Sequence, residues 1–154
     1  MRRSASVACL GAVLVLSAAA CRSRIPDASW GDARLSVALL HGGEDERIQA
    51  AILLSKRPTP ADLWPFVKAL GDERWEVRDA AAQGLGRLGD PRALVPLEHS
   101  LRDGHWWVRA GAAQALGALG SPRAAPFLRA SRADENDAVR EAADEALEAV
   151  GASP

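Results

Sequence analysis

A segment that recurs every 31 residues constrains the fold of this chain more than any other feature. Residues 72–93 return as residues 103–124, and the same displacement continues into residues 134–151. The best matched positions are Val77 and Val108, Arg78 and Arg109, Leu85 and Leu116, Gly89 and Gly120, and Pro91 and Pro122. A degenerate copy starts near residue 41, and a half copy before it supplies one helix. One period kept over several copies predicts a stack of similar units.

Each unit has the pattern of two helices joined by a tight turn. The apolar positions of the first helix are Val77, Ala81, Leu85 and Leu88, which lie on one helical face. Gly89 is expected to end that helix, and Asp90 with Pro91 to begin the second one. The buried side of the second helix is then Leu94, Leu97 and Leu101. Ala and Gly at the neighbouring positions predict close contact between helices.

This unit resembles the short HEAT-like repeat of the phycobilisome lyases. The resemblance covers about residues 41–151, and its motif is Asp72, Val77, Arg78, Ala81, Leu85, Gly89, Pro91, Leu94 and Leu97, recurring in register. It implies an all-α fold, a right-handed α-solenoid of stacked antiparallel helix pairs with about three and a half repeats. It also implies that the second helices line the concave side. In the last unit the apolar stripe weakens to Arg132, as expected where a stack meets water.

The first 20 residues have the pattern of a signal peptide. Arg2 and Arg3 precede an uncharged run from residue 4 to residue 20. This run is shorter than the ~20 predominantly apolar residues that span a bilayer, so an uncleaved anchor is the second choice. The stretch from Leu16 to Cys21 resembles a bacterial lipobox, which predicts cleavage before Cys21 and its lipidation. The alternative is an ordinary cleavage site.

The predicted organisation is a signal peptide at 1–20, a lipidated cysteine and tether at 21–31, and a repeat domain at 32–154. The protein is expected on the periplasmic side of a bacterial membrane, held through Cys21. Without lipidation it would be secreted or soluble in the periplasm. The cysteines, Cys9 and Cys21, lie in the leader or at its edge, which leaves no cysteine pair for a disulfide or a zinc site in the repeat domain. With 19 basic and 20 acidic side chains, the charge balance does not favour nucleic-acid binding.

Three aspartate and arginine pairs recur with the repeat and are expected to form a structural ladder. They are Asp72 and Arg78, Asp103 and Arg109, and Asp134 and Arg140. One pair in each unit is typical of capping and of contacts between repeats, and not of a catalytic site. The family resemblance implies that each arginine reaches an acidic neighbour in the adjoining unit.

No residue pattern points to an enzyme or to a bound cofactor. His41, His99 and His105 do not have the spacing of metal ligands, and they are expected to be solvated. Deoxyhypusine hydroxylases, which are enzymes with HEAT-like repeats, bind iron through His-Glu dipeptides, and this chain contains none. The sequence also has no phosphate loop and no nucleophile with a base. The protein is therefore expected to be non-catalytic, to use no cofactor and to contain no metal.

The tryptophans are the strongest surface signal. Trp75 and Trp106 share a repeat position and are expected to pack over the junction between repeats. Trp64 is different, because it lies opposite the buried side of a second helix. The candidate partner-binding residues on the concave face are Trp64, Lys68, Val95, His99, Arg102 and Arg129. A mixed wall with one aromatic anchor suits a protein or peptide segment better than a polyanion.

The sequence thus predicts a scaffold of the bacterial cell envelope that binds another protein. The alternative from a different class is a lyase-like enzyme or chaperone that handles a tetrapyrrole or other cofactor. A third possibility is an accessory subunit whose tryptophans are covered in a permanent complex.

Overall fold

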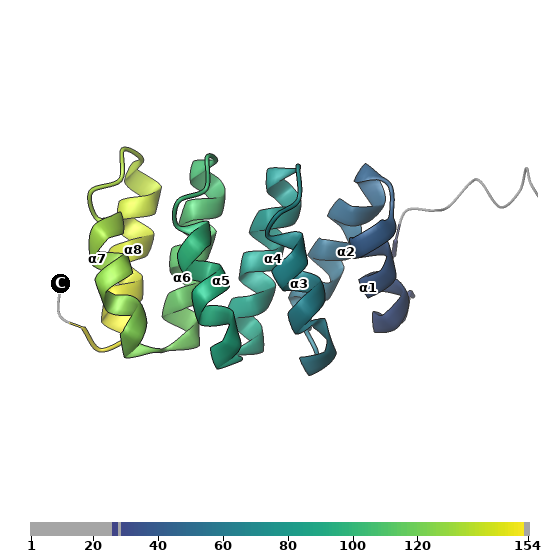
Figure 1. Cartoon of the computed structure of the whole chain (residues 1–154), viewed down its shortest axis with the longest axis horizontal. Coiled ribbons are helices and arrows are strands. Elements are labelled where there is room, and N and C mark those ends of the chain that lie inside the picture. The colour runs from purple at the N-terminus through teal and green to yellow at the C-terminus, as the bar shows by residue number, and fades with distance from the viewer. Residues whose placement is uncertain (1–25, 28, 153–154) are drawn as a thin grey trace, which may run out of the picture.

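The computed structural model describes residues 26, 27 and 29–152, and this part of the chain contains eight α-helices and no strand. Figure 1 shows the helices as antiparallel pairs stacked side by side along the long axis, from α1 to α8. The all-α solenoid predicted from the repeat is therefore confirmed. The predicted signal peptide and Cys21 lie outside the described residues. Within them, no helix is long and apolar enough to span a bilayer.

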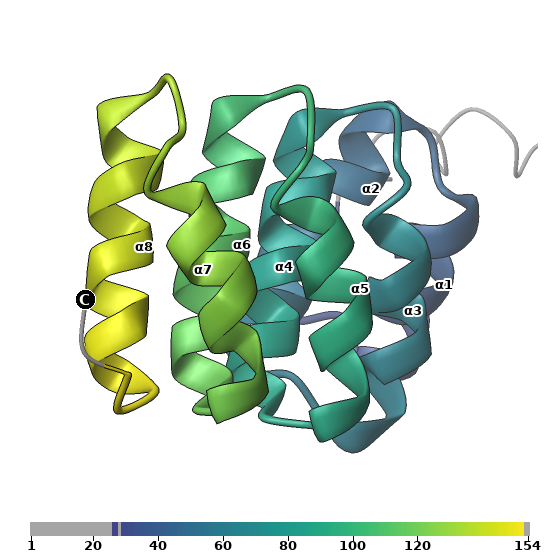
Figure 2. The same cartoon turned by 60° about the vertical axis from the view of Figure 1, so that its left-hand side comes forward.

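The helices form two rows, which Figure 2 shows one behind the other. The first-helix row consists of α2 (Glu44–Lys56), α4 (Trp75–Leu88), α6 (Trp106–Leu119) and α8 (Asp137–Ala149). The second-helix row consists of α1 (Asp32–His41), α3 (Leu63–Ala69), α5 (Leu94–Ser100) and α7 (Ala125–Ser131). Each of the last three follows a 3-10 turn, at Pro60–Asp62, Pro91–Ala93 and Pro122–Ala124.

The second helices start three residues later than the proline pattern predicts. Pro91 opens a 3-10 turn, where the Asp90 side chain accepts a hydrogen bond from the Arg92 amide, and the α-helix begins only at Leu94. Pro96 is the third residue of α5, in the first turn, where a helix does not need the amide hydrogen that proline lacks. The N-terminal capping was predicted correctly, but the type of helix at its start was not.

The core runs between the two rows. Val77, Ala81 and Leu85 on α4 are fully buried, as are their equivalents on α6, and Phe66 of α3 is fully buried beneath them. The helices α4 and α6 end at Gly89 and Gly120, whose φ angles of 67° and 66° are left-handed and favour glycine.

Both ends of the stack are covered by partly polar surfaces. At the N-terminal end Trp30 packs against the core, with the Arg34 guanidinium 3.5 Å from its ring centroid. The boundaries predicted from the sequence place Trp30 in the tether. At the C-terminal end Arg132 is exposed and forms an ion pair of 2.7 Å with Asp144.

Glycines at the contacts between first helices allow those helices to approach closely. A Cβ built at Gly86 would lie 2.7 Å from the Ala115 Cα, and one at Gly117 would lie 2.9 Å from the Ala146 Cα. Since both obstacles are backbone atoms, only a shift of a whole helix could relieve either clash.

Replacement of Gly86 by alanine is therefore expected to lower the free energy of unfolding by about 1 kcal/mol. Overpacking costs ~1–3 kcal/mol, and the better helix propensity of alanine offsets about 1 kcal/mol of it. Urea unfolding measures the change. The control is Gly104→Ala, because a Cβ at Gly104 meets nothing within 4 Å. Equal stability of the two variants would mean that the helix contact is not tight.

Candidate functional site

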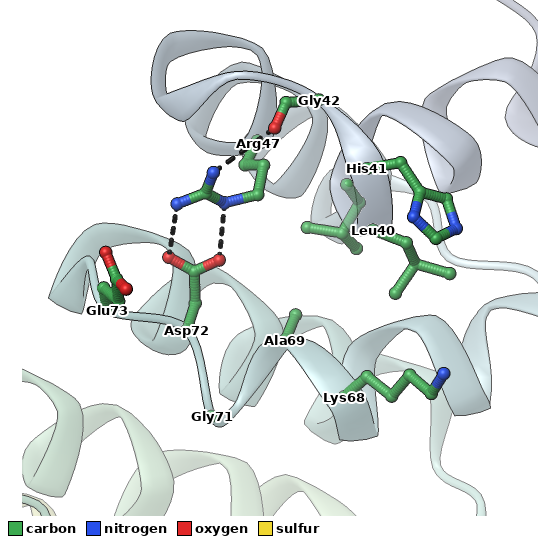
Figure 3. Close-up of a pocket in the computed structure, with 10 residues that line it drawn as sticks. Leu40, His41, Gly42, Arg47, Lys68, Ala69, Gly71, Asp72 and Glu73 are labelled. Carbon is green, nitrogen blue, oxygen red and sulfur yellow. Dashed lines mark hydrogen bonds and ion pairs between the residues drawn. The ribbon is translucent and has the colours of Figure 1, made fainter.

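A ladder of arginine and aspartate side chains runs along one end of the helix pairs. Figure 3 shows its first rung, in which the Arg47 guanidinium points toward the Asp72 carboxylate and also donates to the Gly42 carbonyl. A pocket of about 480 Å³ lies beside this rung and is lined on one side by Lys68.

The arginine of each unit pairs with the aspartate 25 residues later, in the next unit. Every rung has two hydrogen bonds, from Nε to Oδ2 and from Nη2 to Oδ1. Their lengths are 2.7 and 3.2 Å for Arg47 with Asp72, 2.7 and 2.8 Å for Arg78 with Asp103, and 2.8 and 2.9 Å for Arg109 with Asp134. The ladder residues named from the sequence are thus brought together between repeats. Asp72 pairs with Arg47, and Arg140 begins no further rung but lies next to Asp137.

Each rung also fastens the loop before a first helix. Asp103 accepts a hydrogen bond of 2.8 Å from the His105 amide, and Arg109 donates one of 3.0 Å from Nη1 to the Asp103 carbonyl. The same two bonds recur in the following unit. The carboxylate and guanidinium groups of the rung are therefore hydrogen-bonded within the protein, and the ladder holds adjacent repeats in register.

The ladder depends on ionised carboxylates. Hydrogen bonds from Arg109 hold the pKa of Asp134 below its ordinary value of 3.8, against the opposing effect of burial. Because the pKa is lower in the folded state, the rung stabilises the fold above pH 3.8 and this contribution is lost as the pH falls through the folded-state pKa.

The six candidate partner-binding residues lie exposed on or next to the second-helix row. Trp64 is 64% exposed and Val95 is 53% exposed. The four polar candidates, all exposed, are Lys68, His99, Arg102 and Arg129. Their place on a concave wall, which the family resemblance implies, stays a prediction.

Shallow grooves separate neighbouring second helices. Val95 and His99 line one of about 370 Å³ between α3 and α5. Arg102 and Phe127 line another of about 260 Å³ between α5 and α7. Four of the candidate residues are therefore distributed over these two grooves and the pocket lined by Lys68, and no single pocket of the described structure contains all six.

Four aromatic rings cluster where α4 meets α6. Trp75 stacks on His105 with ring centroids 4.5 Å apart and planes inclined by 4°, and Trp106 packs edge-on to Trp107 at 4.6 Å. His105 caps α6, since its Nδ1 accepts a hydrogen bond from the Trp107 amide. His105 lies in the loop before α6, as the sequence predicts, but it is half-buried and not fully solvated, because its ring is stacked and bonded.

A groove on the first-helix row was not predicted from the sequence. It crosses α4, α6 and α8 and measures about 480 Å³. We call it the acidic groove, and its polar and aromatic walls are Asp79, Gln83, Trp107, Gln114, Glu141 and Glu145. None of the residues that line it is a lysine or an arginine.

The 31-residue register could have revealed this groove. Asp79 and Glu141 occupy equivalent positions two repeats apart, and Gln83, Gln114 and Glu145 share another position four residues later. Residues four apart lie on the same helical face, so the register predicts a polar row of Gln83, Gln114 and Glu145 beside a second row in which Ala110 separates Asp79 from Glu141. The apolar periodicity marks the buried face of the same helices, so it gives no information about the face that carries the groove.

Asp79 is the most unusual side chain of the acidic groove. It is 8% exposed, and its Oδ2 accepts a hydrogen bond of 2.8 Å from Gln83. Its buried Oδ1 has no hydrogen-bond partner within the described structure. Oδ1 faces Gly111 on the next helix, where a Cβ would lie 2.2 Å from it. Burial raises the pKa of Asp79 to about 6, against the lowering effects of Gln83, Trp107 and His105.

The described residues contain no group of three or more histidine, cysteine, aspartate or glutamate side chains placed to hold a metal ion.

Comparisons with known proteins agree with the repeat architecture. The chain matches the family model of HEAT repeats over residues 32–106 and 65–148. No curated protein matches it. Among solved structures, it is similar to the complex of CpcE and CpcF of phycocyanin lyase from Nostoc sp. PCC7120, at 27% identity and a TM-score of 0.71, over 84% of this chain and 56% of that one.

A second similar structure is human deoxyhypusine hydroxylase in complex with glycerol, at 26% identity and a TM-score of 0.68, over 82% of this chain and 46% of that one. The chain thus spans about half the length of each of these two proteins. The match to the family model extends over most of the repeat domain, and it agrees with the paired helices and their 31-residue register. On these grounds the chain belongs to the HEAT-repeat family.

Proposed function

We propose that this protein is a non-catalytic scaffold of the bacterial cell envelope that binds another protein through its second-helix row. The observation that carries the proposal is the position of the exposed apolar side chains. Of the five large ones in the described structure, four lie on the second-helix row: Val37, Trp64, Val95 and Phe127. Apolar side chains gathered on one face of a stack are typical of a binding surface.

The polar surroundings of these side chains also fit a protein partner. Lys68, Arg102 and Arg129 are exposed on the same row, so the apolar centre has a charged rim. The similar lyase structure is a complex of two subunits, which supports a role in protein association. The envelope location rests on the signal-peptide and lipobox patterns that end at Cys21.

Photo-crosslinking in cells tests the binding surface. A photoreactive amino acid at position 64 is expected to yield a discrete protein adduct. The same group at Glu148, an exposed position on α8, is expected to yield none. Trp64→Ala should weaken retention of the crosslinked partner by about tenfold or more, since an aromatic anchor carries much of an interface, without changing stability by more than about 0.5 kcal/mol. Equal adducts from both positions would contradict the proposal.

Intact mass and membrane fractionation test the anchor. In a Gram-negative host, the wild type expressed with its own leader should gain the mass of a diacylglycerol group and sediment with membranes. Cys21→Ser should lose both properties. A full-length mass and a cytoplasmic location for the wild type would contradict the envelope role.

A second candidate function is the handling of a tetrapyrrole, which the similarity to the phycocyanin lyase structure favours. The two functions differ in a direct observation. A tetrapyrrole-handling protein should take up bilin and acquire visible absorbance, whereas the proposed scaffold should show neither.

A further inference from the structure

The acidic groove has a carboxylate that the fold itself leaves incompletely satisfied. Asp79 is more than nine-tenths buried, its Oδ2 bonds to Gln83, and its Oδ1, which lies against Gly111, has no hydrogen-bond partner among the described residues. The ladder aspartates are bound by arginines, but the lining of the groove supplies no cationic side chain to Asp79. Leaving a buried polar atom unpaired costs ~1–3 kcal/mol, so this arrangement points to a group supplied from outside.

The rest of the groove has the same sign of charge. Glu141 and Glu145 of α8, two repeats after Asp79, line the far side of the groove, and both are exposed. Three carboxylates on two helices, with no compensating base in the lining, create a negative potential in a hollow between protein walls. The complementary ligand is a cation.

Trp107 gives this cation a flat surface to lie on. Its side chain is 46% exposed, and its ring is held by edge contact with Trp106 and lies 6.1 Å from the Trp75 ring. Indole faces attract guanidinium and ammonium groups, and the attraction increases when the ring is fixed and partly desolvated. Arginine combines this stacking with paired hydrogen bonds to a carboxylate, which lysine cannot form.

The two glutamines indicate that the cation belongs to a peptide chain. Gln83 and Gln114 occupy equivalent positions on adjacent helices, one repeat apart along the groove. An amide side chain can both donate to and accept from the backbone of an extended segment. A small free amine would need neither glutamine nor a groove that continues across three helices.

We propose that the acidic groove binds an extended, arginine-containing segment of a protein partner, with a guanidinium between Asp79 and Trp107 and the backbone along Gln83 and Gln114. This site is separate from the second-helix row, so it does not depend on the proposed partner surface there.

Fluorescence anisotropy with the full-length protein tests the site. The probe is a labelled extended peptide of glycine and serine with two arginines, and its matched control carries citrulline, which is neutral and nearly isosteric with arginine, at both positions. The wild type is expected to bind the arginine peptide about tenfold or more tightly than the citrulline peptide, with affinity that falls as salt rises. Equal affinity for the two peptides would overturn the proposal.

Three variants locate the binding. Asp79→Asn and Trp107→Leu are each expected to lose about tenfold in affinity, since each removes one side of the guanidinium site. Glu148→Gln removes the same charge from α8 outside the groove and should have little effect. Equal losses in Asp79→Asn and Glu148→Gln would mean that only net charge attracts the peptide, and the site would be refuted. Thermal melts monitored by circular dichroism confirm that each variant is folded, and Trp107→Leu remains informative if Asp79→Asn is not.

Two further outcomes would replace the proposed ligand. If N-acetyl-arginine amide binds as tightly as the peptide, the groove is a small-cation site and the peptide is wrong. If the wild type forms a dimer in sedimentation experiments that Asp79→Asn abolishes, the occupant is a basic surface of a second copy. Trp64→Ala, which tests the second-helix row, should leave peptide affinity unchanged, so the two proposals can fail separately.

Discussion

Replacement of Asp103 by alanine is expected to lower the free energy of unfolding by about 3 kcal/mol or more. The change removes both carboxylate acceptors of the Arg78 guanidinium, whose side chain is only 17% exposed, and leaves that charge with its bonds to the Asp72 and Glu73 carbonyls alone. Breaking a fully buried ion pair from one side costs ~3–5 kcal/mol, because the remaining charge has lost its solvent and its partner. This pair is part-buried, with side chains 17% and 13% exposed, so its loss is expected at the lower end of that range. Chemical unfolding at pH 7 measures the loss.

Companion variants separate the parts of this effect. Asp103→Asn keeps an oxygen for the His105 amide but removes the charge, so it should fall between the alanine variant and the wild type. The double variant Arg78→Met with Asp103→Ala should lose less than the sum of the two single changes, since no unpaired charge remains.

The control for the rung is Arg132→Ala. Its ion pair with Asp144 has side chains that are 44% and 50% exposed, and pairs of this kind contribute less than ~1 kcal/mol. A loss in Asp103→Ala no larger than that of Arg132→Ala would show that the ladder does not hold the repeats together.

Replacement of Asp79 by asparagine is expected to stabilise the protein by about 2 kcal/mol at pH 8, with a gain that shrinks toward pH 4. Burial raises the pKa of Asp79 from 3.8 to about 6, and a difference of one unit corresponds to ~1.4 kcal/mol. Since the folded state holds its proton more tightly, the wild type loses stability as the pH rises from 3.8 to about 6. Asparagine carries no charge and avoids this loss, although its amide hydrogens need partners.

Urea unfolding between pH 4 and pH 8 checks this expectation. Asp79 faces Gln83 on its own helix and Trp107 and His105 of the next unit, and these three groups lower the pKa of Asp79 against the larger effect of burial. Glu141→Gln is the matched control, because Glu141 occupies the equivalent position but is exposed. A difference between wild type and Asp79→Asn that does not vary with pH would show that burial of the charge is not the cause. A gain in stability together with a loss of peptide binding would identify Asp79 as a residue kept for binding.

Much of the fold could be predicted because the same apolar pattern and the same helix-ending residues recur in several repeats. The sequence correctly predicted that Val77, Ala81 and Leu85 are buried on one face of α4 and that Gly89 ends this helix. Both predictions depend only on spacing within one helix. The proline at position 91 marked the start of the second segment, but the pattern could not distinguish a 3-10 turn from the first turn of an α-helix. The two differ by one residue in hydrogen-bond spacing, and capping residues serve both.

The candidate sites were predicted unequally. The exposure of Trp64 was predicted correctly, because an aromatic residue opposite a buried stripe must face outward. The acidic groove was missed, although Asp79 and Glu141 share a repeat position, because its walls come from three helices and its importance depends on which atoms are buried.

The sequence by itself determined the repeat unit, its helical periodicity and the glycine that ends each of α4 and α6. All of these depend on residues close together in the chain, whose spacing sets which face they share. The tertiary structure alone decided which acidic side chain Arg78 reaches, namely Asp103 through two hydrogen bonds, and that Gly111 comes against the Asp79 carboxylate. It also decided that His105 stacks on Trp75. These contacts join different helices, so they exist only after packing has set the distance between neighbouring repeats, and that distance depends on all the small side chains between them.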